Sequence, residues 1–163
     1  MAYYITLFAF FAILLALSVV DAITQEIPPA FPIAIFVLGI ISIWTMGNLS
    51  LLERIIGFFV VSLPMYLIVL LVPGGFGGGD IKLMAAAGFF LGWKITLISF
   101  LIALLLGGIY GALLLILQKK GRKDHFAFGP FLCIGMFVGF YRGEALLSWY
   151  LGIAQTLANG PGM

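Results

Sequence analysis

The sequence predicts an all-α fold, a polytopic transmembrane helical bundle of about six helices. The mean hydropathy of the 163 residues is +1.25, and only 9% of them are charged. Several apolar runs reach about 18 residues, the length that crosses the hydrocarbon core of a bilayer. These observations exclude a soluble domain. No linker or shift in composition divides the chain, so one integral membrane domain is expected over residues 1–163.

Short polar or Pro/Gly-rich stretches separate the apolar runs. The first run is interpreted as a retained span and not as a signal peptide, because the first basic residue of the chain is Arg54. Pro64 is expected to kink the third helix. The fourth run is only about 20 Å long as a helix, so it either crosses the bilayer or re-enters it. The six expected helices cover residues 3–20, 30–47, 55–72, 81–93, 95–117 and 128–153.

Glycines recur at four-residue spacing in the later helices. This spacing places small residues on one helix face and lets neighbouring backbones approach closely. Packing within one bundle is the expected role, and dimerisation is not indicated. The glycines are Gly88 and Gly92, Gly107 and Gly111, and Gly135, Gly139 and Gly143.

Composition also limits the chemistry. Cys133 is the only cysteine, which excludes an internal disulfide and a Cys-x-x-Cys metal site. No metal or other cofactor is expected. The net charge of +2 is small and its carriers are scattered, so a nucleic-acid partner is not expected either.

Two aspartates lie at the ends of apolar runs. Asp21 follows the first expected helix, and Asp80 precedes the fourth. Two spans separate the loops that hold them, so both aspartates must lie on the same face of the membrane. This inference depends only on counting the crossings.

The orientation of that face depends on the fourth helix. If it crosses, the basic stretch 119–123 and Lys82 lie on the aspartate side, opposite Arg54, Lys94 and Arg142. The positive-inside rule then places the aspartates in the cytoplasm. If the helix is re-entrant, the basic stretch moves to the other face and the aspartates are extracytoplasmic. Charge counting leaves both arrangements open.

Each aspartate has a structural and a functional interpretation. Asp80 follows glycines and precedes an apolar run, which is typical of a helix N-cap, and Asp21 can be a solvated helix end. Acids that border the hydrocarbon core are nevertheless functional candidates. Two carboxylates brought close together share one proton, so one becomes a base and the other an acid. Such a pair can activate water towards a peptide carbonyl.

The stretch PGGFGGGD, residues 73–80, places five glycines in front of Asp80. Glycine permits backbone angles that other residues avoid, and it removes side chains from the approach to the carboxylate. We expect Gly77, Gly78 and Gly79 to let an extended substrate strand come close to Asp80. A Cβ at Gly79 is expected to obstruct that strand most.

Three segments of the sequence carry motifs: residues 77–83, GGGDIKL, Asp21 with the later Ile27-Pro28, and residues 128–132, FGPFL. Together they resemble the prepilin peptidases, also called type IV leader peptidases, which are intramembrane aspartyl proteases. The first segment matches the G-x-G-D-x-K-L signature of that family. The second is similar to its first catalytic aspartate with a downstream Ile-Pro, and the third is similar to a late motif of the family. The resemblance implies that Asp21 and Asp80 are catalytic.

The resemblance also implies a substrate and a location. It implies an aspartic endopeptidase of type IV pilus and secretion systems that cleaves the short basic leader of prepilins or pilin-like proteins after a glycine. The enzyme would be a multi-pass protein of the inner membrane, and its active site would face the cytoplasm. Longer relatives carry paired Cys-x-x-Cys motifs and methylate the new amino terminus. This sequence has no Cys-x-x-Cys motif, so methyltransferase activity is not predicted.

Other roles remain open on the residues alone. In a small transporter or proton-conducting bundle, Asp21 and Asp80 would be pathway carboxylates. A non-catalytic subunit of a pilus machine is a third possibility. The glycine run favours the protease, because a proton relay does not need it. Lys82 is a candidate for binding substrate or lipid phosphate, and membrane lipid is an expected partner.

Overall fold

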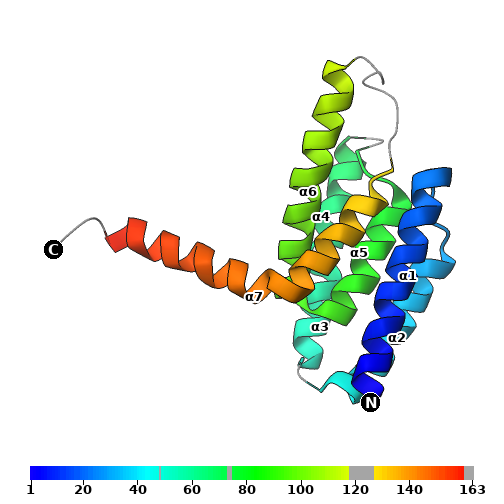
Figure 1. The fold of residues 1–163 in the computed structure, drawn as a ribbon, viewed down its shortest axis with the longest axis vertical. Helices are drawn as coiled ribbons and strands as arrows, with labels where there is room; N and C mark the ends of the chain where they lie inside the picture. Colours follow the sequence, from blue (N-terminus) through cyan, green and yellow to red (C-terminus); the bar gives the residue numbers. More distant parts are fainter. Residues whose placement is uncertain (48, 73–74, 118–126, 160–163) are drawn as a thin grey trace.

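The computed structural model describes residues 1–47, 49–72, 75–117 and 127–159. These residues form helices and no strands, and α3 and α4 together make one kinked helix, which confirms the predicted bundle of about six helices (Figure 1). The segments are α1 (Ala2–Thr24), α2 (Ala30–Met46), α3 (Leu51–Val60), α4 (Ser62–Leu71), α5 (Gly78–Leu91), α6 (Trp93–Ile116) and α7 (Gly129–Asn159).

The break between α3 and α4 lies at Val61, three residues before Pro64. Proline has no amide hydrogen to donate to the preceding turn, and its ring clashes with the carbonyl of that turn, so the helix kinks there. The Ser62 hydroxyl donates to the Phe58 carbonyl, which occupies an acceptor of the last turn of α3. The predicted kink in the third helix is therefore confirmed.

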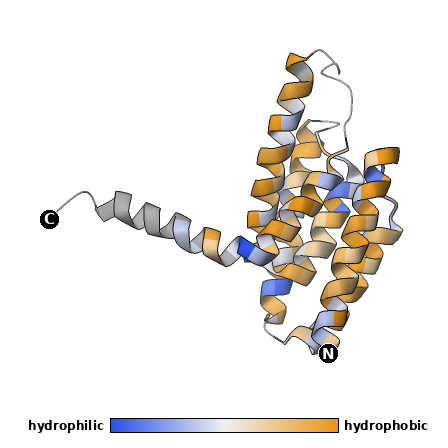
Figure 2. Cartoon of the chain, viewed as in Figure 1, coloured by the Kyte–Doolittle hydropathy of each residue, from blue (hydrophilic) through white to orange (hydrophobic). Residues whose placement is uncertain are grey.

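Three helices of the described chain are long and apolar enough to cross a membrane: Ala2–Thr24, Leu51–Leu71 and Trp93–Leu114. Helix α2 is apolar but shorter, with 17 residues. Most residues of the helices have high hydropathy (Figure 2), and many large apolar side chains are exposed on the outside of the bundle. Leu71, Trp44 and Phe8, for example, are more than 70% exposed. Such an exposed apolar surface fits contact with lipid, and the chain is a membrane protein.

The short helix α5 forms the centre of the bundle, in contact with α2, α3, α4 and α6. Its buried side chains include Leu83, Met84, Ala87 and Phe90, all at most 2% exposed. The Phe90 ring stacks on Phe10 of α1 with the ring centroids 4.1 Å apart. Because other helices surround α5, its 14 residues do not have to match the thickness of the bilayer.

Helix α5 begins three residues earlier than the sequence predicts. Gly77 is its N-cap, Gly78 and Gly79 form its first turn, and Asp80 is its third residue. The interpretation of Asp80 as an N-cap is therefore wrong. Its carboxylate instead reaches back to accept a hydrogen bond from the Gly77 amide, with 3.2 Å between the nitrogen and Oδ2. This is the part of a capping box that a side chain at the third position supplies.

The spaced glycines pack inside the bundle, as expected. A methyl group at Gly88 of α5 would overlap the carbonyl oxygen of Gly57 in α3, and one at Gly57 would overlap the carbonyl of Gly88. Gly135 and Gly139 of α7 meet α6 in the same way at Ser99. Small residues at these crossings let the backbones touch.

Arg54 is buried inside the bundle. The sequence alone instead places it among the basic residues of the loops. Its side chain is 1% exposed. One guanidinium nitrogen, Nη1, donates to Ser42 Oγ over 2.6 Å and to the Phe89 carbonyl over 3.2 Å. The other, Nη2, donates to the Ser42 carbonyl over 3.3 Å. Arg54 thus ties α3 to α2 and α5.

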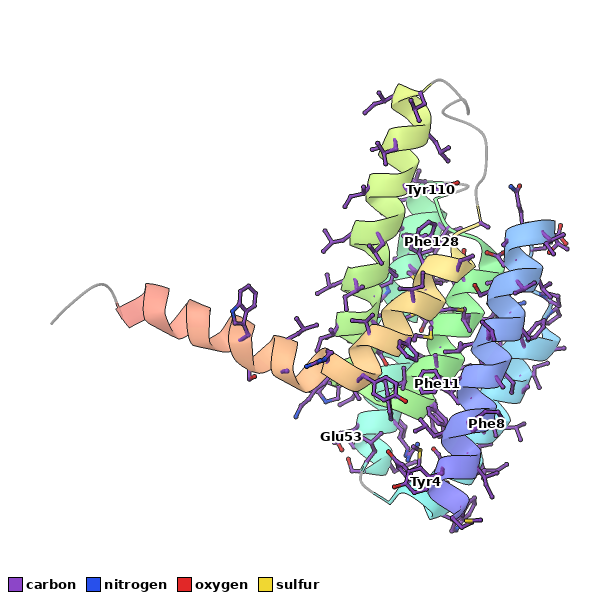
Figure 3. All side chains as sticks on the ribbon, viewed as in Figure 1. Tyr4, Phe8, Phe11, Glu53, Tyr110 and Phe128 are labelled. Atoms are coloured by element: carbon purple, nitrogen blue, oxygen red, sulfur yellow. The ribbon has the colours of Figure 1, made fainter. Side chains whose placement is uncertain are left out.

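Helix α7 begins against α6 and α1 and continues to Asn159, beyond the predicted end at residue 153. It continues through Arg142 and Glu144 without a break. Its later turns project away from the other helices (Figure 1). The first residues of α7 lie at the end of the bundle where α1 ends and α5 begins. Figure 3 shows Phe128 at that end, and Glu53 and Tyr4 at the opposite end.

Candidate active site

A pocket of about 250 Å³ opens where α1 ends and α5 begins. It brings Asp21 together with Asp80, although the two are 59 positions apart. The two aspartates are 4% and 8% exposed. The structure therefore places both at the same end of the bundle, as counting the crossings predicts. The lining residues are Asp21, Gln25, Glu26, Ile27, Gly77, Gly78, Gly79 and Asp80.

Asp21 is held from two directions. It lies in the last turn of α1, where its carbonyl accepts from the amide of Gln25, the left-handed residue that ends the helix (φ 56°). Its carboxylate accepts a 2.8 Å hydrogen bond at Oδ2 from the Gly129 amide, at the start of α7. A helix N-terminus carries free amides and a partial positive charge, so it stabilises a carboxylate.

Asp80 lies outside the three candidate membrane-spanning helices, in the first turn of α5. Burial raises the pKa of its carboxyl to about 6. The nearby charge of Asp21 raises it as well, and the hydrogen bond from the Gly77 amide opposes both. The two carboxylates are therefore close enough for the charge of one to disfavour the charge of the other.

The three glycines before Asp80 occupy different surroundings. A Cβ at Gly79 would lie 2.6 Å from the Cβ of Ile27, so this glycine lets α5 dock against the loop after α1. At Gly78 a Cβ would meet no atom within 4 Å. Gly78 is the position where an added side chain would enter the pocket. The contact with Ile27 gives Gly79 a role in packing, and its expected role as the closest point of substrate approach stays a prediction.

Aromatic rings stand beside the glycine segment. The rings of Phe76 and Phe128 lie 5.9 Å apart, and Phe76 is 6.2 Å from Phe100 of α6. These contacts connect the segment before α5 to the residues before α7. The F-G-P-F-L segment is thus placed beside the G-x-G-D segment, and its glycine contacts Asp21.

Lys82 is not brought into this pocket. Its side chain is exposed on α5 and is absent from the lining. A residue two positions after Asp80 points about 200° away around a helix, which is the geometry expected for it. Among the described residues there is also no group of three or more His, Cys, Asp and Glu side chains that could hold a metal ion.

The role of Gly129 was not identified from the sequence. The sequence displays the F-G-P-F-L motif, but no residue property indicates that the Gly129 amide binds Asp21, 108 positions earlier. A Cβ on Gly129 would lie 2.6 Å from Asp21 Oδ2. A glycine directly before a proline at the start of an apolar run is the signal that was available, because it leaves a helix start open to a neighbour.

A sequence model described as the type IV leader peptidase family matches residues 8–112, more than half of the chain. This region includes both aspartates. The chain belongs to the type IV leader peptidase family. The matched region begins in α1 and ends within α6, so it contains every residue that lines the pocket.

Individual relatives support membership of the type IV leader peptidase family. The chain is 35% identical over 137 residues to the prepilin leader peptidase/N-methyltransferase of Escherichia coli, covering 81% of this chain and 60% of the relative. It is 32% identical over 146 residues to the protein of that name from Pseudomonas aeruginosa, covering 86% and 50%. The corresponding Legionella pneumophila protein is 41% identical over 76 residues, covering 47% and 26%.

The chain thus spans about half the length, or less, of most of the curated type IV leader peptidase relatives it matches. No solved structure matches the chain significantly.

Proposed function

We propose that the chain is an intramembrane aspartyl endopeptidase that removes the short basic leader from prepilins or pilin-like proteins. The observation that carries the proposal is the shared pocket of Asp21 and Asp80 in a chain of the type IV leader peptidase family. Family membership gives no support to a transporter. The 163 residues would act as one peptidase domain.

The chemistry follows from the pair of carboxylates. Because Asp21 and Asp80 disfavour each other's charge, the pair holds one shared proton at about pH 6, the pKa of Asp80. The ionised member takes a proton from water, the water attacks the peptide carbonyl, and the protonated member donates to the carbonyl oxygen. Asp21 is the better placed anion, because the start of α7 supplies its hydrogen bond. Asp80 is then the proton donor.

The pocket also fits the proposed substrate. Glu26 is exposed on its lining and adds a negative charge near the aspartates, which would attract the basic residues of a leader. Gly77 and Gly78 are exposed and leave one wall of the pocket without side chains. The glycine that precedes the cleaved bond in the substrate would let the substrate backbone approach the backbone of Gly77 and Gly78 closely.

The proposed orientation places the pocket at the cytoplasmic face of the inner membrane. Single cysteines at the two ends of α1 test it, in a Cys133→Ser background. Ala2→Cys should react with a membrane-impermeant thiol reagent in intact cells, and Thr24→Cys should react only after the cells are opened. The opposite pattern would reverse the orientation. Both positions are exposed, so reactivity reports the side of the membrane.

The activity is tested with purified protein and a prepilin-like substrate that has a basic leader, a glycine and a following apolar helix. Cleavage is followed as a change in substrate mass. Asp21→Asn and Asp80→Asn should each abolish cleavage and leave the helical content unchanged. Arg142→Gln, which removes one charge from an exposed position on α7, is the matched control and should cleave normally. Normal cleavage by either aspartate variant would refute the proposal.

A further inference from the structure

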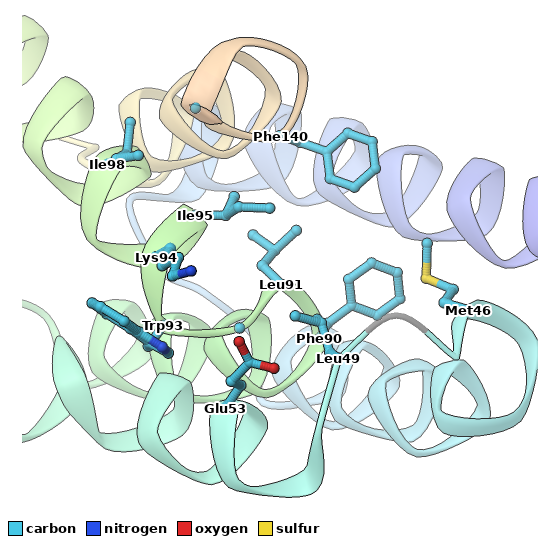
Figure 4. A pocket seen from close by; sticks show the side chains of 12 residues that line it. Met46, Leu49, Glu53, Phe90, Leu91, Trp93, Lys94, Ile95, Ile98 and Phe140 are labelled. Carbon is cyan, nitrogen blue, oxygen red and sulfur yellow. The ribbon is translucent and has the colours of Figure 1, made fainter. Parts of the chain in front are cut away.

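A second cavity lies at the opposite end of the bundle from the aspartates. Its volume is about 320 Å³, within the range of small-molecule sites. It is bounded by the end of α2, the start of α3, the end of α5, the start of α6 and the middle of α7 (Figure 4). Its apolar walls are formed mainly by Met46, Phe90, Leu91, Ile95, Ile98 and Phe140.

Two opposite charges stand at this apolar cavity. Glu53 reaches it from α3, and Lys94 reaches it from the first turn of α6 (Figure 4). Lys94 attracts the Glu53 carboxylate electrostatically, and its Nζ lies 5.7 Å from the centre of the Trp93 ring. Tryptophan and lysine are the residues that commonly mark the boundary between hydrocarbon and headgroups.

Within the described part of the chain, the hydrogen bonds to the Glu53 carboxylate all come from Ser50 and reach one of its two oxygens. The amide and the hydroxyl of Ser50 both donate to Oε2, over 2.9 and 3.0 Å. These bonds complete the capping box at the start of α3 and fix the position of the side chain. The other oxygen, Oε1, can accept from a ligand. A fixed carboxylate beside an ammonium group, both at the rim of an apolar cavity, suits a zwitterionic ligand with an apolar tail.

We propose that this cavity is a binding site for one phospholipid with a primary ammonium headgroup, of the phosphatidylethanolamine class. The ammonium group donates to Glu53, the phosphate pairs with Lys94, and part of an acyl chain occupies the apolar walls. The trimethylated ammonium of phosphatidylcholine has no N–H to donate, and phosphatidylglycerol has no cation for Glu53. The site is therefore selective for the primary ammonium.

Native mass spectrometry of the full-length protein tests this selectivity. The detergent-solubilised protein is exposed to an equimolar mixture of phosphatidylethanolamine, phosphatidylcholine and phosphatidylglycerol with identical acyl chains. We expect one phosphatidylethanolamine to be retained about tenfold better than phosphatidylcholine, as the loss of one charge-assisted hydrogen bond implies. Equal retention of all three lipids, or a preference for phosphatidylglycerol, would overturn the proposal.

Two variants examine the two parts of the site. Glu53→Gln keeps the capping box, because glutamine also serves at its third position, and it should lower the retention of phosphatidylethanolamine to that of phosphatidylcholine. Glu26→Gln, at the other end of the bundle, is the matched control and should keep the preference. If Glu53→Gln retains phosphatidylethanolamine as the unchanged protein does, the headgroup assignment is wrong.

Gly143→Leu examines the apolar part. A Cβ at Gly143 would meet Ile98 Cδ1 at 3.5 Å and Ile95 Cγ1 at 4.0 Å, which are ordinary contacts. A Cβ is therefore accommodated, and because Gly143 lines the cavity we expect the leucine side chain to occupy part of it. It should reduce the retention of all three lipids, and circular dichroism shows whether the helices are intact. Undiminished retention by a folded Gly143→Leu protein would also refute the site.

Discussion

The amide of Gly129 donates a 2.8 Å hydrogen bond to Oδ2 of Asp21 across 108 positions of sequence. This bond places the start of α7 against the end of α1. It means that the F-G-P-F-L segment contributes directly to the surroundings of one aspartate. The segment does so through its backbone, so the requirement is for a glycine and not for a functional side chain.

Gly129→Ala should therefore impair cleavage. Its Cβ would lie 2.6 Å from Asp21 Oδ2 and would displace the carboxylate. A displacement of about 1 Å can cost on the order of a hundredfold in rate, and we expect the loss in kcat more than in KM. Gly108→Ala in α6 is the matched control, since its Cβ would meet no atom within 4 Å. Equal rates for the two variants would show that the contact does not position Asp21.

Gly78 and Gly79 should respond differently to the same substitution. Gly78→Val places its side chain in the open pocket, so it should block cleavage with little change in the melting temperature. Gly79→Val meets Ile27 and should lower the melting temperature as well as the rate. Thermal unfolding and cleavage assays on both variants separate the two effects. A stable but inactive Gly79→Val protein would instead support the role in substrate approach that the sequence predicts.

Hydropathy and the counting of crossings were sufficient to predict the helices and the common face of Asp21 and Asp80. The helices and the common face both follow from the order of the apolar runs, which can be read from the sequence alone. The start of α5 was missed because glycine is a poor helix former. In the structure, Asp80 accepts from the Gly77 amide, and close packing against Ile27 leaves no room for a side chain at Gly79. Tertiary contacts thus override the local propensity.

The long-range contacts could not be predicted. The bond between Gly129 and Asp21 depends on how α7 packs against α1, and no local pattern records that packing. The sequence places Arg54 among the loop charges because it lies near the start of an apolar run. It is buried because Ser42 and two backbone carbonyls of other helices supply its acceptors. Such acceptors become apparent only when the helices are assembled.

The raised pKa of Asp80 predicts a pH-dependent effect on stability. Burial, and then the charge of Asp21, raises this pKa from its ordinary value of 3.8 to about 6. The folded state therefore binds the proton more tightly than the unfolded state, and ionised Asp80 destabilises the fold above about pH 6. Asp80→Asn should raise the melting temperature at pH 8, by a stabilisation on the order of 2 kcal/mol.

This gain should shrink between pH 6 and pH 4 and vanish below about pH 4, where the aspartate is protonated in both states. Thermal unfolding in detergent at pH 8 and pH 4 measures it. Asparagine can still accept from the Gly77 amide, so the helix start is preserved. A melting temperature at pH 8 below that of the unchanged protein would show that the charge of Asp80 stabilises the fold.

The contact between Gly57 and Gly88 should be among the least tolerant of the bundle. A methyl group on either glycine would overlap the carbonyl oxygen of the other. The obstacle is backbone on both sides, so no side-chain rotation relieves it, and α3 must separate from α5. Because α5 also carries Asp80, we expect Gly88→Ala to destabilise the fold by about 4 kcal/mol or more. We also expect it to separate the two aspartates.

Gly108→Ala again serves as the control, since alanine is the better helix former and space is available there. The yield of folded protein and the melting temperature of the two variants test this expectation, and a Gly88→Ala protein that melts like the control would mean that α3 and α5 do not cross at these glycines.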